Sequence, residues 1–191
     1  MALIRILNRK TLSEKKYLLQ NITFEIKDSS GKLHTQQREV YFRPQGATLL
    51  LYNPVKRTVL LSRQFRLPAY LIDQEKDLIE TCAGMIDEGE TPKEAIIREA
   101  EEELGYRVAF VSKVCEAYPS PGGLSELIHF YIAPYSDDMK VNAGGGKKDE
   151  EEDIDVLELS FVQVRDMLEK GEFTDAKTII LIQYAIIKGL I

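Results

Sequence analysis

The chain has 191 residues, of which 44% are hydrophobic and 29% are charged, the balance of an ordinary globular protein. The formal net charge of -6 argues against a nucleic-acid polymer as partner, because phosphate backbones are bound by clustered Lys and Arg. No apolar run approaches the ~20 residues of a transmembrane helix, and the charged N-terminus lacks the apolar core of a signal peptide. We therefore expect a cytoplasmic protein without membrane contact.

The N-terminal part of the sequence predicts strands in pairs. Residues 15–29 and 33–43 are strand-like on either side of a Gly-containing turn, and this pattern predicts a hairpin. A second pair of apolar runs, at 47–52 and 58–65, is separated by an Asn-Pro turn. Both pairs predict antiparallel neighbours in a sheet.

The remaining sequence adds strands and then helices. Further strands are expected at 77–82, 109–117, 126–133 and 154–159, and helices at 161–170 and 176–188. The segment 142–153 combines a glycine run with acids and predicts a mobile loop. Many strands with few helices predict an α+β fold, a mixed β-sheet sandwiched between helices. We expect a domain at 44–191 and an N-terminal β-hairpin extension at 1–43.

One further helix has a clear beginning and end. Thr91 can be its N-cap, Pro92 occupies the first helical position, and Glu94 can complete a capping box with Thr91. Gly105 is a suitable C-terminal cap. These residues predict a helix from 92 to 104.

The residues of this helix separate into two faces. The apolar face, which must contact the core, consists of Ile96, Ile97, Ala100 and Leu104. Glu99, Glu102 and Glu103 share another face, because they are spaced i, i+3 and i+4, and Glu101 points elsewhere. A divalent cation would remove the repulsion among three carboxylates, since Mg²⁺ prefers oxygen ligands. The alternative is a solvated acidic face, the usual role of a charge run.

The sequence around the helix matches every fixed position of the Nudix box. Gly84 is followed after five residues by Glu90 and after seven more by 98–106, Arg-Glu-Ala-Glu-Glu-Glu-Leu-Gly-Tyr. Ala100 and Tyr106 depart mildly, since the family usually has an aliphatic residue at both positions. The chain thus resembles the Nudix hydrolases, which implies the Nudix fold and hydrolysis of a diphosphate linked to another moiety.

The resemblance also implies a metal site. The expected ligands are the side chains of Glu99, Glu102 and Glu103 and the carbonyl oxygen of Ala83. Arg98 would pair with Glu90 and hold the preceding loop against the helix instead of touching the metal. The implied cofactor is Mg²⁺, with Mn²⁺ as an alternative.

Motifs outside the box narrow the substrate. Residues 38–41, 63–66 and 120–123 resemble the ADP-ribose and nucleotide-sugar pyrophosphatases, and residues 142–146, 149–153 and 156–159 are similar to their GDP-mannose pyrophosphatase branch. This similarity implies hydrolysis of a nucleoside diphosphate sugar, with GDP-mannose giving GMP and mannose 1-phosphate. An ADP-ribose pyrophosphatase is the alternative among enzymes, and a nucleotide-sugar-binding sensor is the alternative among non-enzymes.

The same resemblance implies a set of substrate contacts. They are Tyr17, Gln37, Arg38, Glu39, Arg66, Ala83, Gly84, Met85, Glu103, Glu126, Glu151, Glu152 and Lys177. Gln37 departs from the branch, which can have a basic residue at this position. Without the resemblance, Arg38 and Arg66 could equally be surface charges, since exposed Arg is common.

The acidic run after the glycines contains further candidates. In the resembling enzymes the corresponding loop closes on the metal site, which implies that Glu152 is a metal ligand, that Glu151 contacts substrate and that Glu150 is the general base. Five consecutive acids leave this assignment open by one position. The simpler interpretation is a solvated loop.

The N-terminal extension indicates an assembly. The resembling enzymes are dimers whose N-terminal segments cross between subunits and complete the partner's site. We therefore expect a homodimer with a swapped N-terminal segment, in which Tyr17 serves the other subunit. The alternative is a hairpin that folds onto its own core, because sequence neighbours usually pair within a chain.

Overall fold

The computed structural model describes residues 4–73, 77–147 and 152–191. The chain forms two compact units, one comprising Met1–Gln45 with Tyr118–Leu127 and the other comprising Gly46–Ala117 with Ile128–Ile191. Within the described residues, no helix combines the length and the apolar character needed to cross a membrane.

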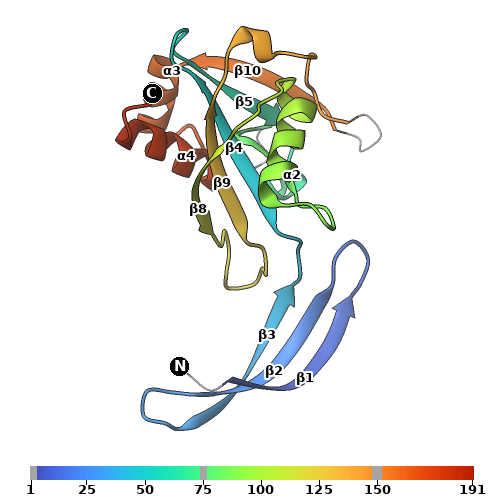
Figure 1. Cartoon of the computed structure of the whole chain (residues 1–191). Helices are drawn as coiled ribbons and strands as arrows, with labels where there is room; N and C mark the ends of the chain where they lie inside the picture. The colour runs from blue at the N-terminus through green and yellow to red at the C-terminus, as the bar shows by residue number, and fades with distance from the viewer. Residues whose placement is uncertain (1–3, 74–76, 148–151) are drawn as a thin grey trace. The chain divides into compact units, whose positions relative to one another are not determined.

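The smaller unit contains a three-stranded antiparallel sheet (Figure 1). Its strands, in spatial order, are β1 (Ile4–Ser13), β2 (Leu19–Lys27) and β3 (Leu33–Tyr41). The predicted hairpin is confirmed as β2 and β3, and Gly31 in its turn has φ +84°, where glycine is favoured. Strand β1 was not predicted, because nearly all of it is exposed and charged residues interrupt its apolar positions.

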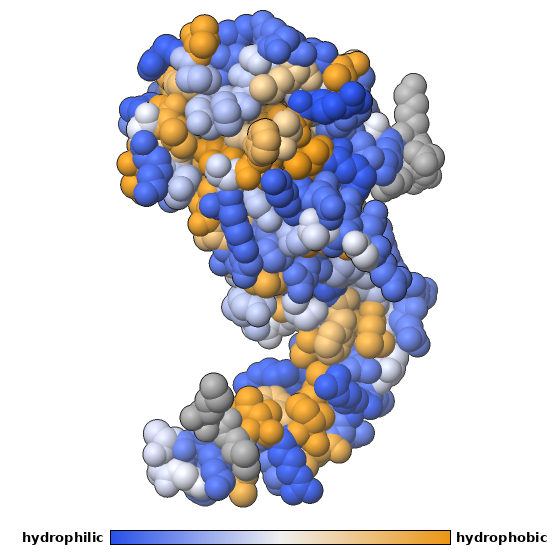
Figure 2. Space-filling view, viewed as in Figure 1, coloured by the Kyte–Doolittle hydropathy of each residue, from blue (hydrophilic) through white to orange (hydrophobic). Residues whose placement is uncertain are grey.

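One face of this sheet carries apolar pairs between β1 and β2. Ile4 lies opposite Ile26, and Ile6 lies opposite Phe24, so these side chains form cross-strand pairs. Ile4 and Ile6 are 57% and 45% exposed, although such residues are normally covered. Apolar residues are visible on this part of the surface in Figure 2.

The larger unit is built on a mixed sheet, as expected. Its strands are β4 (Gly46–Asn53), β5 (Thr58–Gln64), β6 (Leu78–Glu80), β7 (Cys82–Met85), β8 (Ser112–Ala117), β9 (Ile128–Pro134) and β10 (Ile154–Ser160). The spatial order is β10-β5-β4-β9-β8, with β6 paired to β5 and β7 paired to β4. Strands β4 and β9 are parallel, and the other pairs are antiparallel.

Helices cover both faces of this sheet. The helical segments are α1 (Leu67–Asp73), α2 (Pro92–Glu99), the π-helical turn η1 (Ala100–Leu104), the 3₁₀ turn η2 (Asp137–Met139), α3 (Phe161–Glu169) and α4 (Ala176–Ile187). Segments α2 and η1 pack on one face, and α3 and α4 pack on the other (Figure 1). Helix α1 was not predicted, because it has only seven residues, none of which is buried.

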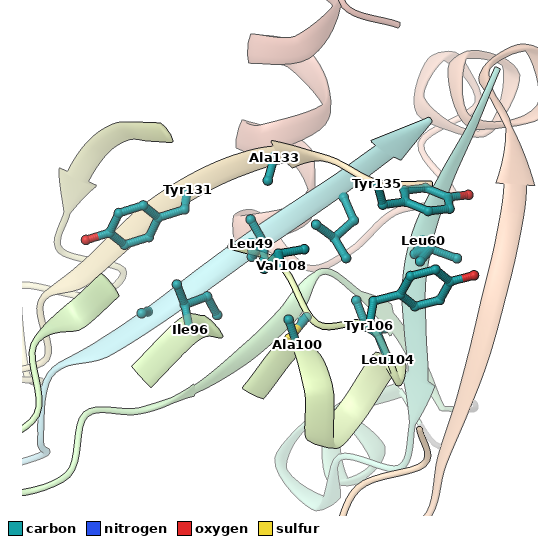
Figure 3. Packing of buried hydrophobic residues seen from close by; sticks show 13 residues of the cluster. Leu49, Leu60, Ile96, Ala100, Leu104, Tyr106, Val108, Tyr131, Ala133 and Tyr135 are labelled. Atoms are coloured by element: carbon teal, nitrogen blue, oxygen red, sulfur yellow. The ribbon is translucent and has the colours of Figure 1, made fainter. Parts of the chain in front are cut away.

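The alternation of β4 divides the core into two layers. Leu49 points toward α2 and η1, while its neighbour Leu50 points toward α3 and α4. Figure 3 shows the first layer, in which Ile96 and Leu104 contact the sheet beside Leu49. These residues are fully buried, and each contributes about 2 kcal/mol through removal of its side chain from water. The predicted core face of the helix is confirmed.

The predicted helix start is also confirmed, but its end differs. Thr91 Oγ1 accepts a hydrogen bond from the Glu94 amide (3.3 Å), and the Glu94 carboxylate accepts one from the Thr91 amide (2.9 Å). The last turn is π-helical instead of α-helical and ends at Gly105, whose amide donates to the Ala100 carbonyl. A π turn contains one more residue than an α turn, which changes the spacing of the side chains that it carries.

Gly105 permits a close approach between this turn and the chain segment at 142. Its φ is +80°, and a Cβ atom at this position would lie 2.4 Å from the carbonyl oxygen of Asn142. Any other residue would have to separate the two backbones. Gly171, after α3, also has a positive φ (+71°) but has nothing within 4 Å of such a Cβ.

We predict that Gly105→Ala lowers the free energy of unfolding by clearly more than Gly171→Ala. The second substitution carries only the left-handed backbone penalty, about 1–2 kcal/mol, whereas the first adds a steric clash. Urea denaturation of the two variants and the wild type measures the difference. Equal losses would show that the approach to Asn142 is not tight.

Candidate active site

Three carboxylates come together at the C-terminal end of α2. The side chains of Glu99 and Glu102 are 14% and 23% exposed, and Glu103 is 2% exposed. The Glu103 carboxylate accepts hydrogen bonds from the Ala83 amide (3.3 Å) and from the Cys82 thiol. Among the described residues no cation forms an ion pair with Glu103, so its charge is only partly compensated.

The proton affinities reflect this burial. Burial, followed by the neighbouring charge of Glu99, raises the pKa of Glu103 to about 8. Burial also raises the pKa of Glu99, and the hydrogen-bonded charge of Arg98 only partly opposes it. Glu152 contributes to both upward pKa shifts, which indicates that its carboxylate lies near the other two.

Arg98 connects the helix to the preceding loop. Its Nε and Nη2 atoms donate to the two oxygens of Glu90, both at 3.1 Å, as the resemblance implied. Its Nη1 atom donates to Glu99 and Glu102, both at 2.9 Å, which was not expected. These hydrogen bonds, led by that of Glu90, raise the pKa of Arg98, so the guanidinium is a permanent charge within the acidic cluster.

Strand β7 approaches the same carboxylates. A Cβ atom on Gly84 would lie 1.9 Å from Glu99 Oε1, so only glycine allows Glu99 to occupy its position. On either side of Gly84, the Ala83 amide donates to Glu103, and the Met85 carbonyl accepts from Arg98 Nη2 (3.3 Å). The three predicted backbone positions therefore lie along the acidic face.

These residues fit a hard divalent cation. The available donors are carboxylate oxygens, which Mg²⁺ and Mn²⁺ prefer, and the partly compensated charge of Glu103 would be relieved by a cation. Within the described residues, however, no group of three or more His, Cys, Asp or Glu side chains is placed so that it could already hold a metal ion. Arg98 and Lys147 instead neutralise Glu102, at 2.9 and 3.1 Å.

Arg66 is held by an acid that the sequence did not single out. Its Nε lies 3.2 Å from both oxygens of Glu80, its Nη2 lies 2.7 Å from Oε2, and Glu80 is only 3% exposed. Burial opposes the charge of Arg66, but Glu80 outweighs burial and raises its pKa. The charges of Glu103 and Asp175 act in the same direction, which indicates that Arg66 lies near the acidic cluster.

Lys177 is held in a similar way at the start of α4. Its Nζ atom lies 2.6 Å from Asp175, which also caps the helix by accepting from the Thr178 amide (2.9 Å). Burial opposes ionisation of Asp175, but Lys177 and Thr178 together lower its pKa. The Thr178 hydroxyl accepts from the Thr81 amide (2.8 Å), so buried hydrogen bonds link α4 to the residue before β7.

The acidic loop is described only in part. Glu152 Oε2 accepts a hydrogen bond from the Lys147 amide (2.9 Å), and a cavity of about 400 Å³ is lined by Arg98, Glu101, Glu102 and Asn142. Glu150 and Glu151 lie outside the described residues.

Glu101 points away from Glu103, as expected, and its carboxylate pairs with Arg107 at 2.8 Å.

The other predicted substrate contacts belong to the smaller unit. Tyr17 and Glu126 both adjoin Arg43, which was not predicted: its guanidinium lies 5.2 Å from the Tyr17 ring centre, and its Nε lies 3.5 Å from Glu126. The remaining contacts are Gln37, Arg38 and Glu39 on β3. Consecutive strand residues alternate, so Arg38 lies on the opposite face from the other two.

We predict that Glu103→Gln raises the melting temperature of the metal-free protein, and does so more at pH 9 than at pH 5. Because the folded-state pKa of Glu103, about 8, exceeds its usual value of 4.5, stability is lost as the pH rises from 4.5 through 8. Gln abolishes that loss. Calorimetry in chelator at several pH values measures it, with Glu101→Gln as control, since removing the Arg107 pair should give no gain.

An increase that does not depend on pH would contradict this origin of the effect. It would indicate that Gln improves packing or hydrogen bonding instead of removing a buried charge.

Comparison with known proteins agrees with this geometry. The NUDIX domain model matches residues 42–181, and a model described as the GDP-mannose pyrophosphatase NudK N-terminal domain matches residues 3–41. The GDP-mannose pyrophosphatase of Escherichia coli O157:H7 is 48% identical over 189 residues, 98% of this chain and 97% of that protein. The GDP-mannose pyrophosphatase of Shigella sonnei (strain Ss046) is 49% identical over 182 residues, 95% of this chain and 94% of that protein.

A solved structure supports the same fold. The crystal structure of an ADP compounds hydrolase has a TM-score of 0.71 at 20% sequence identity, and the match covers 98% of this chain and 95% of that chain. The matched domain spans most of the sequence and includes the acidic helix and the loop before it. The chain belongs to the Nudix family of hydrolases.

Proposed function

We propose that this chain is a pyrophosphohydrolase that cleaves GDP-mannose into GMP and mannose 1-phosphate. The observation that carries the proposal is the similarity to GDP-mannose pyrophosphatases, which extends at 48% identity over both the Nudix domain and the N-terminal segment. The ADP compounds hydrolase is far less similar in sequence, at 20% identity, so ADP-ribose is the weaker candidate.

Hydrolases of this family use divalent cations. We assign Mg²⁺, with Mn²⁺ as the alternative, to a site formed by Glu99, Glu102, Glu103, Glu152 and the Ala83 carbonyl. When bound, the cation supplies stabilisation of the phosphoryl oxygens and activation of water. The chain supplies the arrangement of these oxygens, because the Ala83 amide fixes Glu103 and Arg98 fixes Glu99.

Two cations of the chain are suited to the diphosphate. Arg66 is held by the buried acid Glu80 at 2.7 Å, and Lys177 is held by the half-buried Asp175 at 2.6 Å, so both side chains are already ordered before substrate binds. Water attacks one phosphorus, the anhydride P–O bond breaks, and the leaving phosphate keeps the bond electrons. We assign the removal of the water proton to Glu150, and a substrate contact to Glu151.

The smaller unit supports a dimer with a shared site. One face of its sheet carries the pairs Ile4–Ile26 and Ile6–Phe24, in which Ile4 and Ile6 are exposed, and a second copy of the chain would cover these pairs. We assign the nucleotide-sugar contacts of this unit to Tyr17, Gln37, Arg38, Glu39 and Glu126, and we infer that Tyr17 serves the site of the partner.

A panel of nucleotide sugars tests the substrate assignment. With Mg²⁺, GDP-mannose should be hydrolysed with a kcat/KM at least about tenfold above that for ADP-ribose, because a few base and sugar contacts worth roughly 1–2 kcal/mol give such a ratio. Chelator should abolish turnover. Preference for ADP-ribose would support the alternative substrate, and binding without turnover would support a sensor.

Two variants test in that assay whether Glu103 takes part in turnover. Glu103→Gln should lower kcat by about 100-fold or more, because it removes a charged ligand from the assigned metal site. Glu101→Gln should stay within about twofold of the wild type, since its carboxylate pairs with the exposed Arg107 and is not among the assigned metal ligands. Comparable losses in both variants would refute the assignment of Glu103.

Assembly provides a further prediction. Light scattering should give a mass about twice 21.8 kDa, and Phe24→Asp should shift it toward the monomer by placing a charge among the apolar pairs of β1 and β2. Mixing subunits with Tyr17→Ala and subunits with Glu103→Gln should restore about one quarter of wild-type activity. Half of randomly mixed dimers are heterodimers, and one of the two sites in each heterodimer carries neither defect.

The separate variants before mixing are the control for this experiment. A fully active monomer, or no recovery after subunit exchange, would contradict the shared site.

A further inference from the structure

The glycine run at 144–146 attaches the acidic loop to the metal-site turn. The Gly145 amide donates to the Glu103 carbonyl (2.9 Å), and the Gly146 amide donates to the Glu102 carbonyl (3.1 Å). Both carbonyls lie at a helix end, where no partner within the helix remains for them. A Cβ atom on Gly144 would lie 2.4 Å from the Glu103 carbonyl oxygen, so the contact requires glycine.

Lys147 follows directly after this attachment. Its Nζ atom lies 3.1 Å from Glu102 Oε2, and the exposed fractions of the two side chains are 35% and 23%. Its backbone is fixed as well, because its amide donates to Glu152 Oε2 (2.9 Å) and its carbonyl accepts from the Glu152 amide (3.2 Å). The ammonium group is thus held beside one assigned metal ligand while its own peptide unit contacts another.

The two cations at Glu102 differ in how they are held. The guanidinium of Arg98 is fixed at once by Glu90, Glu99 and Glu102. Lys147 carries its charge as an ammonium on a flexible four-carbon stem, which can move away without disturbing the backbone. When Glu102 coordinates a metal cation, the ammonium group of Lys147 can therefore move away from Glu102 with a smaller loss of free energy than the guanidinium of Arg98.

We propose that Lys147 is a built-in counter-ion of the metal site, which neutralises Glu102 in the metal-free protein and competes with the divalent cation for it. The proposal rests on the assignment of Glu99, Glu102 and Glu103 as metal ligands under the proposed function. It adds that a residue outside the Nudix box sets the cation concentration at which the site fills. Competition of this kind is a coupling between two ligands of the same carboxylate.

The proposal implies that Lys147 raises the stability of the metal-free protein and lowers its affinity for the cation. Without metal, the Lys147–Glu102 pair reduces repulsion among the carboxylates and stabilises the fold. With metal bound, the pair is broken, and its stabilisation no longer contributes. Removal of Lys147 should therefore destabilise the metal-free protein and tighten cation binding.

Calorimetric titration of the full-length protein with MnCl₂ tests the affinity. We expect Lys147→Gln to lower the Kd for Mn²⁺ about two- to fivefold, the range that a partly exposed ion pair supplies. The matched control is Lys170→Gln, which changes the net charge equally but removes the pair with Asp166 (2.6 Å) on α3, and which should leave the Kd within about 1.5-fold.

Thermal unfolding supplies a readout without turnover. In chelator, Lys147→Gln should melt about 1–3 °C below the wild type, and in saturating Mn²⁺ the two should melt within about 1 °C of each other. Lys170→Gln should show the same offset from the wild type in both conditions. A loss of stability that persists in Mn²⁺ would overturn the proposal, because it would show that the pair survives metal binding.

The outcomes also separate this proposal from the ligand assignment. If the wild type binds Mn²⁺, Glu103→Gln loses that binding and Lys147→Gln binds with unchanged or weaker affinity, the counter-ion role is wrong and the ligand assignment stands. If the wild type does not bind Mn²⁺, or Glu103→Gln binds it equally well, the ligand assignment is wrong and the counter-ion role is overturned with it.

Discussion

An ionised carboxylate in a protein interior is costly unless a cation or several hydrogen-bond donors compensate it. Ionisation of Glu103 meets this cost, because its neighbours Ala100 and Leu104 on the same turn are fully buried in the core and keep the turn against the sheet. The Ala83 amide and the Cys82 thiol stabilise its carboxylate by hydrogen bonds, whereas the like charge of Glu99 destabilises it. The burial that weakens the metal-free protein is therefore also what favours a bound cation, so core packing and cation affinity are set by the same turn.

The need to bring backbone close to these carboxylates explains where glycine occurs. Gly84 lets β7 pass beneath Glu99, and Gly144 lets the loop reach the Glu103 carbonyl. Both contacts depend on the absence of a side chain at the glycine, and each brings the backbone close to a glutamate of the acidic cluster. The π turn contributes by adding a residue to the last turn, after which the Glu102 and Glu103 carbonyls accept from the loop. Backbone hydrogen bonds thus join the loop to the helix end through residue 146.

The sequence predicted what depends on local chemistry. The capping box at Thr91 involves residues three positions apart, and the core face of α2 follows from periodicity, so both were predicted correctly. The π turn was missed, because it depends on packing against β7 and the loop. Glu80 was missed for a similar reason: it reaches Arg66 from a neighbouring strand, and its position in the apolar run of β6 was the only local signal of a buried, paired acid. Strand β1 and helix α1 bury almost nothing within the chain, and their apolar patterns are too short to have predicted them.

The balance of charge around the site explains why an anionic substrate would bind there more readily with a cation than without one. The described acids there are Glu80, Glu90, Glu99, Glu102, Glu103, Glu152 and Asp175, and the described cations are Arg66, Arg98, Lys147 and Lys177. Each of these cations already pairs with an acid, so the basic residues alone leave the region negative toward a diphosphate. A divalent cation would offset most of that negative charge, because its two charges would meet carboxylates that the chain leaves undercompensated. The assigned cation would therefore weaken the repulsion of the diphosphate by these acids as well as assist the hydrolytic step.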